Sequence, residues 1–205
     1  MSVAAAGLLT VLSAHGSLAA PSAAENTDRS AVAATAQAQP AAAGTQQLPP
    51  LLTPREAQRI AASPDPLKAA KAADAYRIKN DNSGKCLVAQ GSANDTPAIQ
   101  FNCATFQDQY WIFSGSSFSN VQLVNANSGK CLLVRGGNDG SVAVQYQCAD
   151  YADQKWDVRF DPNGNGHFML ANRNSGKCLV GQNNGSNPFQ FSCNNGFQDQ
   201  WWHNG

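Results

Sequence analysis

The six cysteines of the chain form three pairs of similar spacing. Cysteine can form a disulfide bond, ligate a metal ion or act as a nucleophile, and its spacing helps to separate these roles. A zinc site needs closely spaced cysteine or histidine pairs, and the sequence has neither. An even, fully paired set therefore predicts disulfide bonds and an oxidising compartment. The pairs expected from the repeat described below are Cys86–Cys103, Cys131–Cys148 and Cys178–Cys193.

The other polar residues give little support to catalysis. His167 and His203 are the histidines outside the expected leader, and neither has a nucleophile–base arrangement around it. No glutamate follows Asp74, so a glycosidase would need two aspartates. The segment from Asp161 resembles the start of a calcium loop, but Asn172 stands where the closing carboxylate is needed, which favours a turn. We expect no enzyme activity, no metal and no other cofactor.

A repeat of 45 to 47 residues positions the cysteines. The motif Asn-x-Asn-Ser-Gly-Lys-Cys-Leu starts each copy, at Asn80, Asn125 and Asn172. The motif [Phe/Tyr]-x-Asp-Gln-x-Trp ends each copy, at Trp111, Trp156 and Trp202. The three copies fill residues 76–205, as a first lobe of about 76–117, a second of about 118–163 and a third of about 164–205.

Each copy has the pattern of four short strands. The segments Tyr76–Asn80, Val121–Asn125 and Phe168–Asn172 alternate apolar and polar side chains, as half-buried strands do. Asn-Ser-Gly supplies turn residues before a second strand at Lys-Cys-Leu. A third strand precedes the second cysteine and a fourth surrounds Gln-x-Trp. This pattern predicts a closed all-β fold with pseudo-threefold symmetry, because the competing propeller typically has about four to eight blades.

Residues 1–75 lack every Phe, Tyr and Trp of the chain and cannot hold much of a core. Residues 1–24 combine an apolar run with small-residue cleavage sites and predict a signal peptide, although no basic residue precedes the run. Residues 25–52 predict a disordered Ala/Gln/Pro-rich linker. Residues 53–75 hold a capping box at Thr53 and a second cap at Asp65. They predict short helices that do not pack, or alternatively a docking segment for another protein.

Charge and the length of the apolar runs exclude two classes of partner. From Asp74 onward the chain has nine Lys or Arg residues and ten Asp residues, without a basic cluster. Nucleic-acid binding is therefore not expected. No segment approaches the roughly 20 apolar residues of a membrane-spanning helix, so we expect no membrane span.

At the repeated motifs the sequence closely resembles the ricin-type lectin repeat, a β-trefoil in which each lobe ends in Gln-x-Trp. The resemblance covers Tyr76 to Trp202 in three registered copies. It implies a β-trefoil of three four-stranded lobes behind a largely disordered N-terminal segment. It also implies that Trp111, Trp156 and Trp202 pack in the core near the threefold axis. The motif glutamines, read as buried spacers first and sugar contacts second, are Gln109, Gln154 and Gln200.

The resemblance further implies one shallow sugar site per lobe. An aromatic residue two positions before the second cysteine stacks on the sugar ring, and a polar residue before Gln-x-Trp binds hydroxyl groups. The family's Asp two residues after the first cysteine is replaced by Val88, Leu133 and Val180. Either the carboxylate has moved to the position before Gln-x-Trp, or the pockets no longer bind sugar. The expected pairs are Phe101 with Asp108, Tyr146 with Asp153, and Phe191 with Asp199.

Each site residue also has a structural interpretation. The aspartates could cap the turn entering the last strand, and the aromatics could be rim packing. A second aromatic per lobe either walls the pocket or seals the core edge, at Phe106, Tyr151 and Phe197. We expect Tyr146 and Asp153 to be the most active pair, because only Tyr146 adds a hydroxyl and the third lobe has a shorter loop.

These features predict a secreted, extracellular carbohydrate-binding module with up to three shallow sugar sites. Its expected partner is a polysaccharide or glycan. The alternative is a protein-interaction trefoil that contacts another secreted protein in an extracellular assembly.

Overall fold

The computed structural model describes residues 48–65, 69–70 and 75–205. All of them belong to one compact unit, Gly44–Gly205. The predicted signal peptide and almost all of the predicted linker lie outside the described residues, as does most of the second predicted helix. Among the described residues, no helix reaches the length and apolar character that crossing a bilayer requires.

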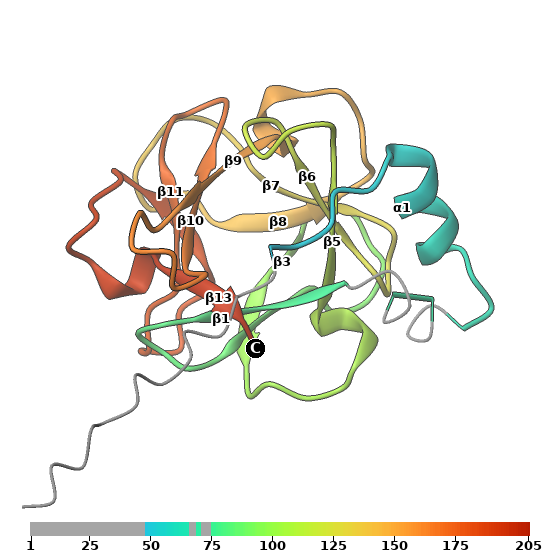
Figure 1. Cartoon of the computed structure of the whole chain (residues 1–205), viewed down its shortest axis with the longest axis horizontal. Coiled ribbons are helices and arrows are strands. Elements are labelled where there is room, and N and C mark those ends of the chain that lie inside the picture. Colours follow the sequence, from blue (N-terminus) through green and yellow to red (C-terminus); the bar gives the residue numbers. More distant parts are fainter. Residues whose placement is uncertain (1–47, 66–68, 71–74) are drawn as a thin grey trace, which may run out of the picture. The chain divides into compact units, whose positions relative to one another are not determined.

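Six antiparallel strands close into a barrel (Figure 1). The first strand pairs with the last one and also with β5, so the two ends of the repeat region lie side by side. Pairings β5–β6, β9–β10 and β10–β13 continue the ring, and a bridge from Val121 to Trp156 closes it. The barrel strands are β1 (Tyr76–Asn80), β5 (Tyr110–Ser114), β6 (Gln122–Asn125), β9 (Trp156–Phe160), β10 (Phe168–Asn172) and β13 (Trp202–Asn204).

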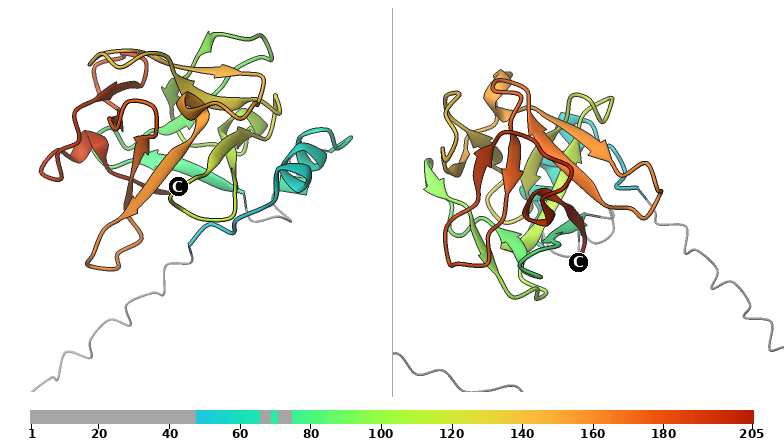
Figure 2. Two further views of the ribbon diagram at one scale, coloured as in Figure 1. Left: turned by 90° about the horizontal axis from the view of Figure 1, so that it is seen from above. Right: turned by 90° about the vertical axis from the view of Figure 1, so that its left-hand side faces the viewer.

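Each lobe adds a hairpin to the barrel (Figure 2). The hairpin strands are β2 (Cys86–Val88) with β4 (Ile99–Phe101), β7 (Cys131–Val134) with β8 (Ala143–Tyr146), and β11 (Cys178–Val180) with β12 (Phe189–Phe191). A short strand β3 (Thr96–Pro97) pairs with β8 and ties the first hairpin to the second. A six-stranded barrel with three hairpins is a β-trefoil, which confirms the predicted fold class.

The asparagine that opens each repeat explains the local turn and the joint between lobes. The Asn80 Oδ1 atom accepts bonds from the backbone N–H groups of Asn82 and Ser83, at 3.1 and 3.0 Å. Its Nδ2 donates to the backbone carbonyl of Asp199 at 2.9 Å, in the third lobe. The fully buried Asn125 and Asn172 likewise donate to the carbonyls of Asp108 and Asp153. These asparagines clamp each lobe to the one before it.

We expect Asn125→Ala to lower the free energy of unfolding by about 2–4 kcal/mol, because buried backbone groups of the turn and of Asp108 lose their partner. The matched control is Asn127→Ala in the same turn. Its exposed amide makes a single 3.3 Å bond, so a loss of about 0.5 kcal/mol or less is expected. Urea denaturation checks both values, and equal losses would contradict the clamp.

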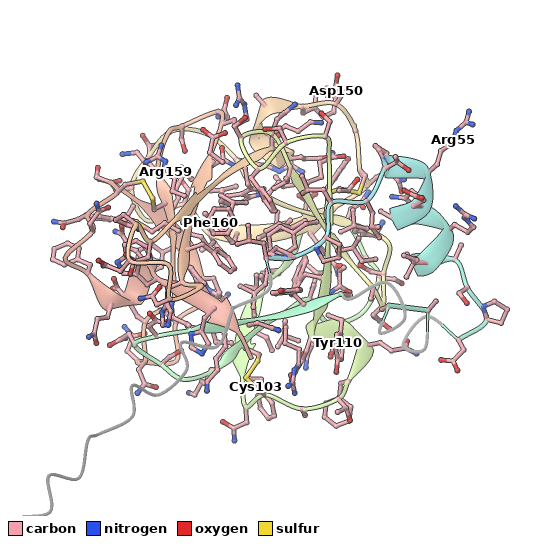
Figure 3. The ribbon with its side chains drawn as sticks, viewed as in Figure 1. Arg55, Cys103, Tyr110, Asp150, Arg159 and Phe160 are labelled. Atoms are coloured by element: carbon pink, nitrogen blue, oxygen red, sulfur yellow. A yellow bond between two sulfur atoms is a disulfide. The ribbon has the colours of Figure 1, made fainter. Side chains whose placement is uncertain are left out.

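The three motif tryptophans form part of one core cluster, as the resemblance implied, and all are 0% exposed. Each indole N–H donates to the carbonyl of the leucine that follows the first cysteine, at 2.9 Å from Trp111, 3.0 Å from Trp156 and 3.1 Å from Trp202. The three predicted disulfide bonds are confirmed, and each joins Cα atoms 5.0 Å apart. Figure 3 labels Cys103 of the first bridge.

The helix α1 (Pro54–Ala61) packs against the trefoil (Figure 1). Its capping box joins Thr53 and Glu56, as the sequence indicated. Ala57 is 0% exposed and belongs to a cluster with Ile112 and Val124. The prediction that this helix does not pack is therefore wrong. The helix has few apolar residues, so its own sequence did not indicate that it packs. The apolar surface that it covers is formed by β5 and β6, which lie far from it in the sequence.

Candidate functional site

The aromatic residues of the first and third lobes present open rings. Phe101 is 56% exposed and Phe191 is 41% exposed, whereas Tyr146 in the second lobe is half-buried. The second aromatic of each lobe is more open still, at 63% for Phe106 and Tyr151 and 49% for Phe197. Such exposure excludes the interpretation that Phe106, Tyr151 and Phe197 seal the core edge.

The third lobe holds a hollow of about 260 Å³ at the predicted position. It brings the predicted residues Phe191, Asp199 and Gln200 together, and Val180 lies in the same wall where the family has its usual aspartate. We call this site the third-lobe hollow. Its lining residues are Val180, Gln182, Phe189, Phe191, Phe197, Asp199 and Gln200.

Asp199 is the acidic residue of this hollow and lies in the 3-10 turn η3 (Gln198–Gln200). Its backbone carbonyl is held by Asn80 and by the N–H of Gly181, at 2.9 and 2.7 Å. Burial raises the pKa of the Asp199 carboxyl, although a bond from the Gln182 side chain works in the opposite direction. The Oδ1 atom is buried and has no hydrogen-bond partner among the described residues.

The turn-capping interpretation of the aspartates finds no support in these contacts. The residue before each 3-10 turn, rather than the aspartate, occupies the N-cap position, and no side-chain cap bond is present at η1 (Gln107–Gln109), η2 (Ala152–Gln154) or η3. Asp108 shares the features of Asp199, since burial raises its pKa and its Oδ1 is also unpartnered. A buried acceptor without a partner lowers the stability of the fold by roughly 1–3 kcal/mol. A bound ligand that donates to this oxygen would supply the missing partner, which is one reason for such an aspartate to be present.

Gln182 is a site residue that the sequence analysis missed. Its Oε1 accepts a 2.9 Å bond from Asn184, and its side chain bonds to the Asp199 carboxyl, which it can reach through its amide N–H group. The equivalent residues in the other lobes are Gln90 and Arg135. The sequence did offer one signal for this residue: the position holds arginine in the second lobe and glutamine in the other two, whereas the positions around it repeat.

The second lobe differs because a cation covers its aromatic ring. The Arg135 guanidinium lies 4.8 Å from the centre of the Tyr146 ring and forms an ion pair with Asp95. The hydrogen bond from Arg135 to Asp95 raises the pKa of the Arg135 guanidinium. Tyr146 and Asp153 make smaller contributions in the same direction. The geometry therefore favours the third lobe over the pair Tyr146 and Asp153 that we expected to be the most active.

The motif glutamines face the protein interior. Gln109 is 1% exposed, accepts from the N–H of Ala104 at 2.7 Å and donates to the carbonyl of Asn102 at 3.0 Å. Gln154 and Gln200 repeat this bridge, so all three are spacers that shape the loop before the last strand. Their side-chain amides are hydrogen-bonded to the backbone. A contact with sugar would therefore have to come from the residues around them.

Asp161 belongs to a turn between β9 and β10, as the sequence analysis favoured. Its carboxylate accepts bonds from the backbone and side chain of Asn163 and from the side chain of Asn165. These bonds lower the pKa of Asp161, with the backbone bond from Asn163 contributing most.

A closed barrel with three hairpins and a Gln-x-Trp spacer in each lobe defines a β-trefoil of the lectin type. The ricin-type beta-trefoil lectin domain matches residues 74–202, and the chain belongs to this family. No curated protein sequence matches.

Several solved structures share the fold. A designed threefold-symmetric protein, ThreeFoil, is 26% identical with a TM-score of 0.58, and the match covers 62% of this chain and 95% of ThreeFoil. An exo-beta-1,3-galactanase from Clostridium thermocellum is 25% identical with a TM-score of 0.58, over 63% of this chain and 29% of the enzyme. The hemolytic lectin CEL-III is 28% identical with a TM-score of 0.50, over 62% of this chain and 29% of that lectin.

Proposed function

We propose that the protein is a secreted carbohydrate-binding module whose principal site is the third-lobe hollow. The observation that carries the proposal is the third-lobe hollow itself, in which the partly buried Asp199 carboxylate, with its Oδ1 atom unpartnered, lies beside the exposed rings of Phe191 and Phe197. Three disulfide bonds support an extracellular location. Family membership supports sugar as the ligand class.

The chemistry of the hollow matches a pyranose ring. Such a ring has apolar C–H faces, which stack on an aromatic side chain, and hydroxyl groups, which donate to a carboxylate. Phe191 supplies the stacking surface, Asp199 accepts from the hydroxyls, and Gln182 holds the carboxylate in place. Drug-sized ligands occupy pockets of about 300–1,000 Å³, so a hollow of about 260 Å³ suits a single sugar unit of a longer glycan.

The carboxylate in this proposal comes from the position before Gln-x-Trp, and not from the family's usual position two residues after the first cysteine. Val180 fills the usual position and contributes only apolar surface. The moved carboxylate implies a sugar specificity different from that of family members that keep the usual aspartate. The first lobe offers a second, weaker site through Phe101 and Asp108, and Arg135 reduces access in the second lobe.

We further propose that the hollow binds without catalysis. Glycoside hydrolysis commonly requires two carboxyl groups flanking the scissile bond. Among the residues that the structure describes, Asp199 is the only acidic one that lines the third-lobe hollow. The match to the exo-beta-1,3-galactanase covers 29% of that enzyme, and the activity in its name belongs to the enzyme as a whole.

A glycan array followed by calorimetry with the best ligand tests the proposal. Phe191→Ala is expected to weaken binding about tenfold or more, because the sugar loses its stacking surface. Tyr146→Ala is the matched control in the second lobe and is expected to change binding less than twofold. If no glycan binds, or if both variants bind as the parent does, the third-lobe site is wrong and a protein-contact role replaces it.

Asp199→Asn is expected to weaken sugar binding and to stabilise the fold at neutral pH. Because the folded-state pKa of Asp199 is raised, its contribution to stability is present at low pH and is lost as pH rises through that pKa. The neutral amide removes this loss. Binding through the carboxylate has the opposite dependence and falls as pH drops through the same pKa. Thermal unfolding and calorimetry from pH 4 to pH 7 check both, and a destabilised variant with unchanged binding would contradict the role of Asp199.

A further inference from the structure

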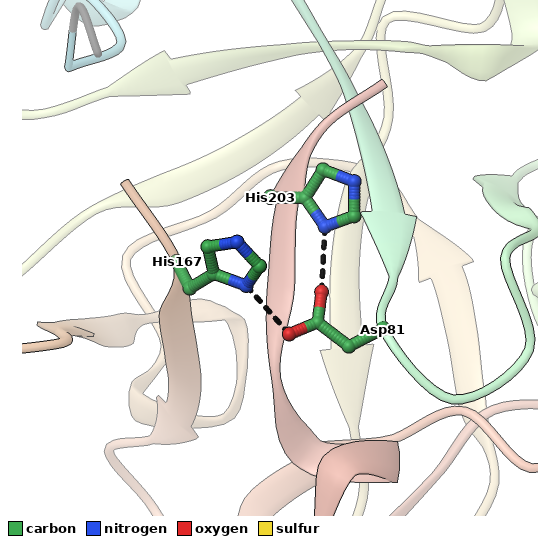
Figure 4. Close-up of side chains that lie close together, drawn as sticks. All are labelled: Asp81, His167 and His203. Carbon is green, nitrogen blue, oxygen red and sulfur yellow. Dashed lines mark hydrogen bonds and ion pairs between the residues drawn. The ribbon is translucent and has the colours of Figure 1, made fainter. Parts of the chain in front are cut away.

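Two histidines and one aspartate converge at the seam between the first and third lobes (Figure 4). His167 Nδ1 lies 2.6 Å from one carboxylate oxygen of Asp81, and His203 Nδ1 lies 2.5 Å from the other. The imidazole rings are 4.9 Å apart between centroids. Asp81 follows β1, His167 precedes β10 and His203 lies in β13, so the cluster joins three separate segments.

Comparison of the three lobe seams shows what is unusual here. The residues equivalent to Asp81 and His203 at the next seam are Arg173 and Asp157, which form an ordinary ion pair at 2.9 Å. At the remaining seam the equivalents are Ala126 and Ile112, which are buried in clusters with residues of the segment that precedes the trefoil. An ion pair or an apolar contact is thus sufficient to join two lobes. A second imidazole on the same carboxylate exceeds what the seam requires.

We propose that Asp81, His167 and His203 bind a divalent transition-metal ion of the zinc class. Two imidazole nitrogens and one carboxylate oxygen are donors that zinc accepts, and a fourth position is then open to water or another ligand. The donor atoms lie within 4.8 Å of one another. Around a tetrahedral zinc ion with bonds of about 2.1 Å they lie about 3.4 Å apart, so modest side-chain rotations are sufficient.

Burial and access also suit a metal ion. The side chains are 18% exposed for Asp81, 29% for His167 and 26% for His203, so an ion can enter from solvent and is then partly shielded. For each Nδ1 to bind the ion, its imidazole must adopt the tautomer that carries the proton on Nε2, which leaves the Nδ1 lone pair free. Bound metal links β13 to β1 and to the start of β10, which closes the barrel at its chain ends.

Calorimetric titration of the full chain with ZnCl₂ at pH 7.5 tests this site, with CaCl₂ as the oxygen-preferring comparison ion. One zinc ion per chain and no calcium binding are expected. Zinc at about 100 times its Kd is expected to raise Tm by about 5–11 °C. His15 lies outside the described residues, and His15→Ala is the control that removes the remaining histidine.

The variants H167Q, H203Q and D81N are each expected to weaken zinc binding at least tenfold. Circular dichroism without metal shows whether each variant folds. Because His167 lies in a turn, H167Q keeps the test valid if changes in the strands unfold the protein. No zinc binding by the parent chain, or unchanged binding in folded H167Q, would overturn the proposal. The proposal would also be overturned if His15→Ala lost zinc binding while the three variants of the proposed site kept it.

Discussion

Reduction of the three disulfide bonds is expected to unfold the trefoil at 37 °C. Each bridge closes a loop of 15 or 17 residues. Loops of this length contribute about 3 kcal/mol each by restricting the unfolded chain. Their sum of about 9 kcal/mol is comparable with the total stability of a typical domain, which is about 5–15 kcal/mol.

Thermal unfolding with and without reductant measures this effect, and alkylation confirms that all six thiols are free. The double variant Cys178→Ala/Cys193→Ala isolates one bridge, with an expected loss of about 3 kcal/mol. Its counterpart in the first lobe, Cys86→Ala/Cys103→Ala, should lose a similar amount, because the two loops differ by only two residues. A fully reduced chain with an unchanged Tm would contradict the prediction.

Trp202→Ala is expected to lower the free energy of unfolding by about 3–5 kcal/mol. The indole is fully buried in the core cluster, so its removal leaves a large cavity. The Leu179 carbonyl also loses its 3.1 Å bond from the indole N–H. Because Leu179 belongs to β11, beside the third-lobe hollow, the variant should bind sugar weakly as well.

The adjacent Trp201 provides a matched control. Its side chain is half-buried, and its indole donates to the carbonyl of Asn195 in an exposed contact. Because the ring also packs against the edge of the Met169, Ala171 and Cys178 cluster, Trp201→Ala is expected to cost about 1–2 kcal/mol, clearly less than Trp202→Ala. Urea denaturation of the two variants measures the difference, and equal losses would show that the core position of the motif tryptophan has been misjudged.

The sequence was sufficient to predict the features that repeat. Alternation of apolar and polar residues in Tyr76–Asn80 matches β1, and the paired cysteines match the three bridges. Trp111 and its counterparts were predicted to be core residues because the resemblance to the ricin-type repeat implies that role for the tryptophan that ends each lobe. Repetition makes these inferences robust, since each is made three times with different neighbours.

Features that break the repeat could not be predicted in the same way. Arg135 covers Tyr146, whereas Gln182 bonds to Asp199, because the second lobe carries arginine at a position where the first and third lobes carry glutamine. The contact of Asp81 with two histidines joins residues more than 80 positions apart. Spacing in the sequence gives no information on such pairs until the barrel brings its ends together.

Mapping of the sugar site by nuclear magnetic resonance tests the central claim most directly. Isotope-labelled protein is titrated with the glycan that binds best on the array. The largest chemical-shift changes are expected at Gln182, Phe191, Phe197 and Asp199, with smaller changes near Phe101. Changes centred on Tyr146 and Asp153, or outside the three lobe pockets, would contradict it.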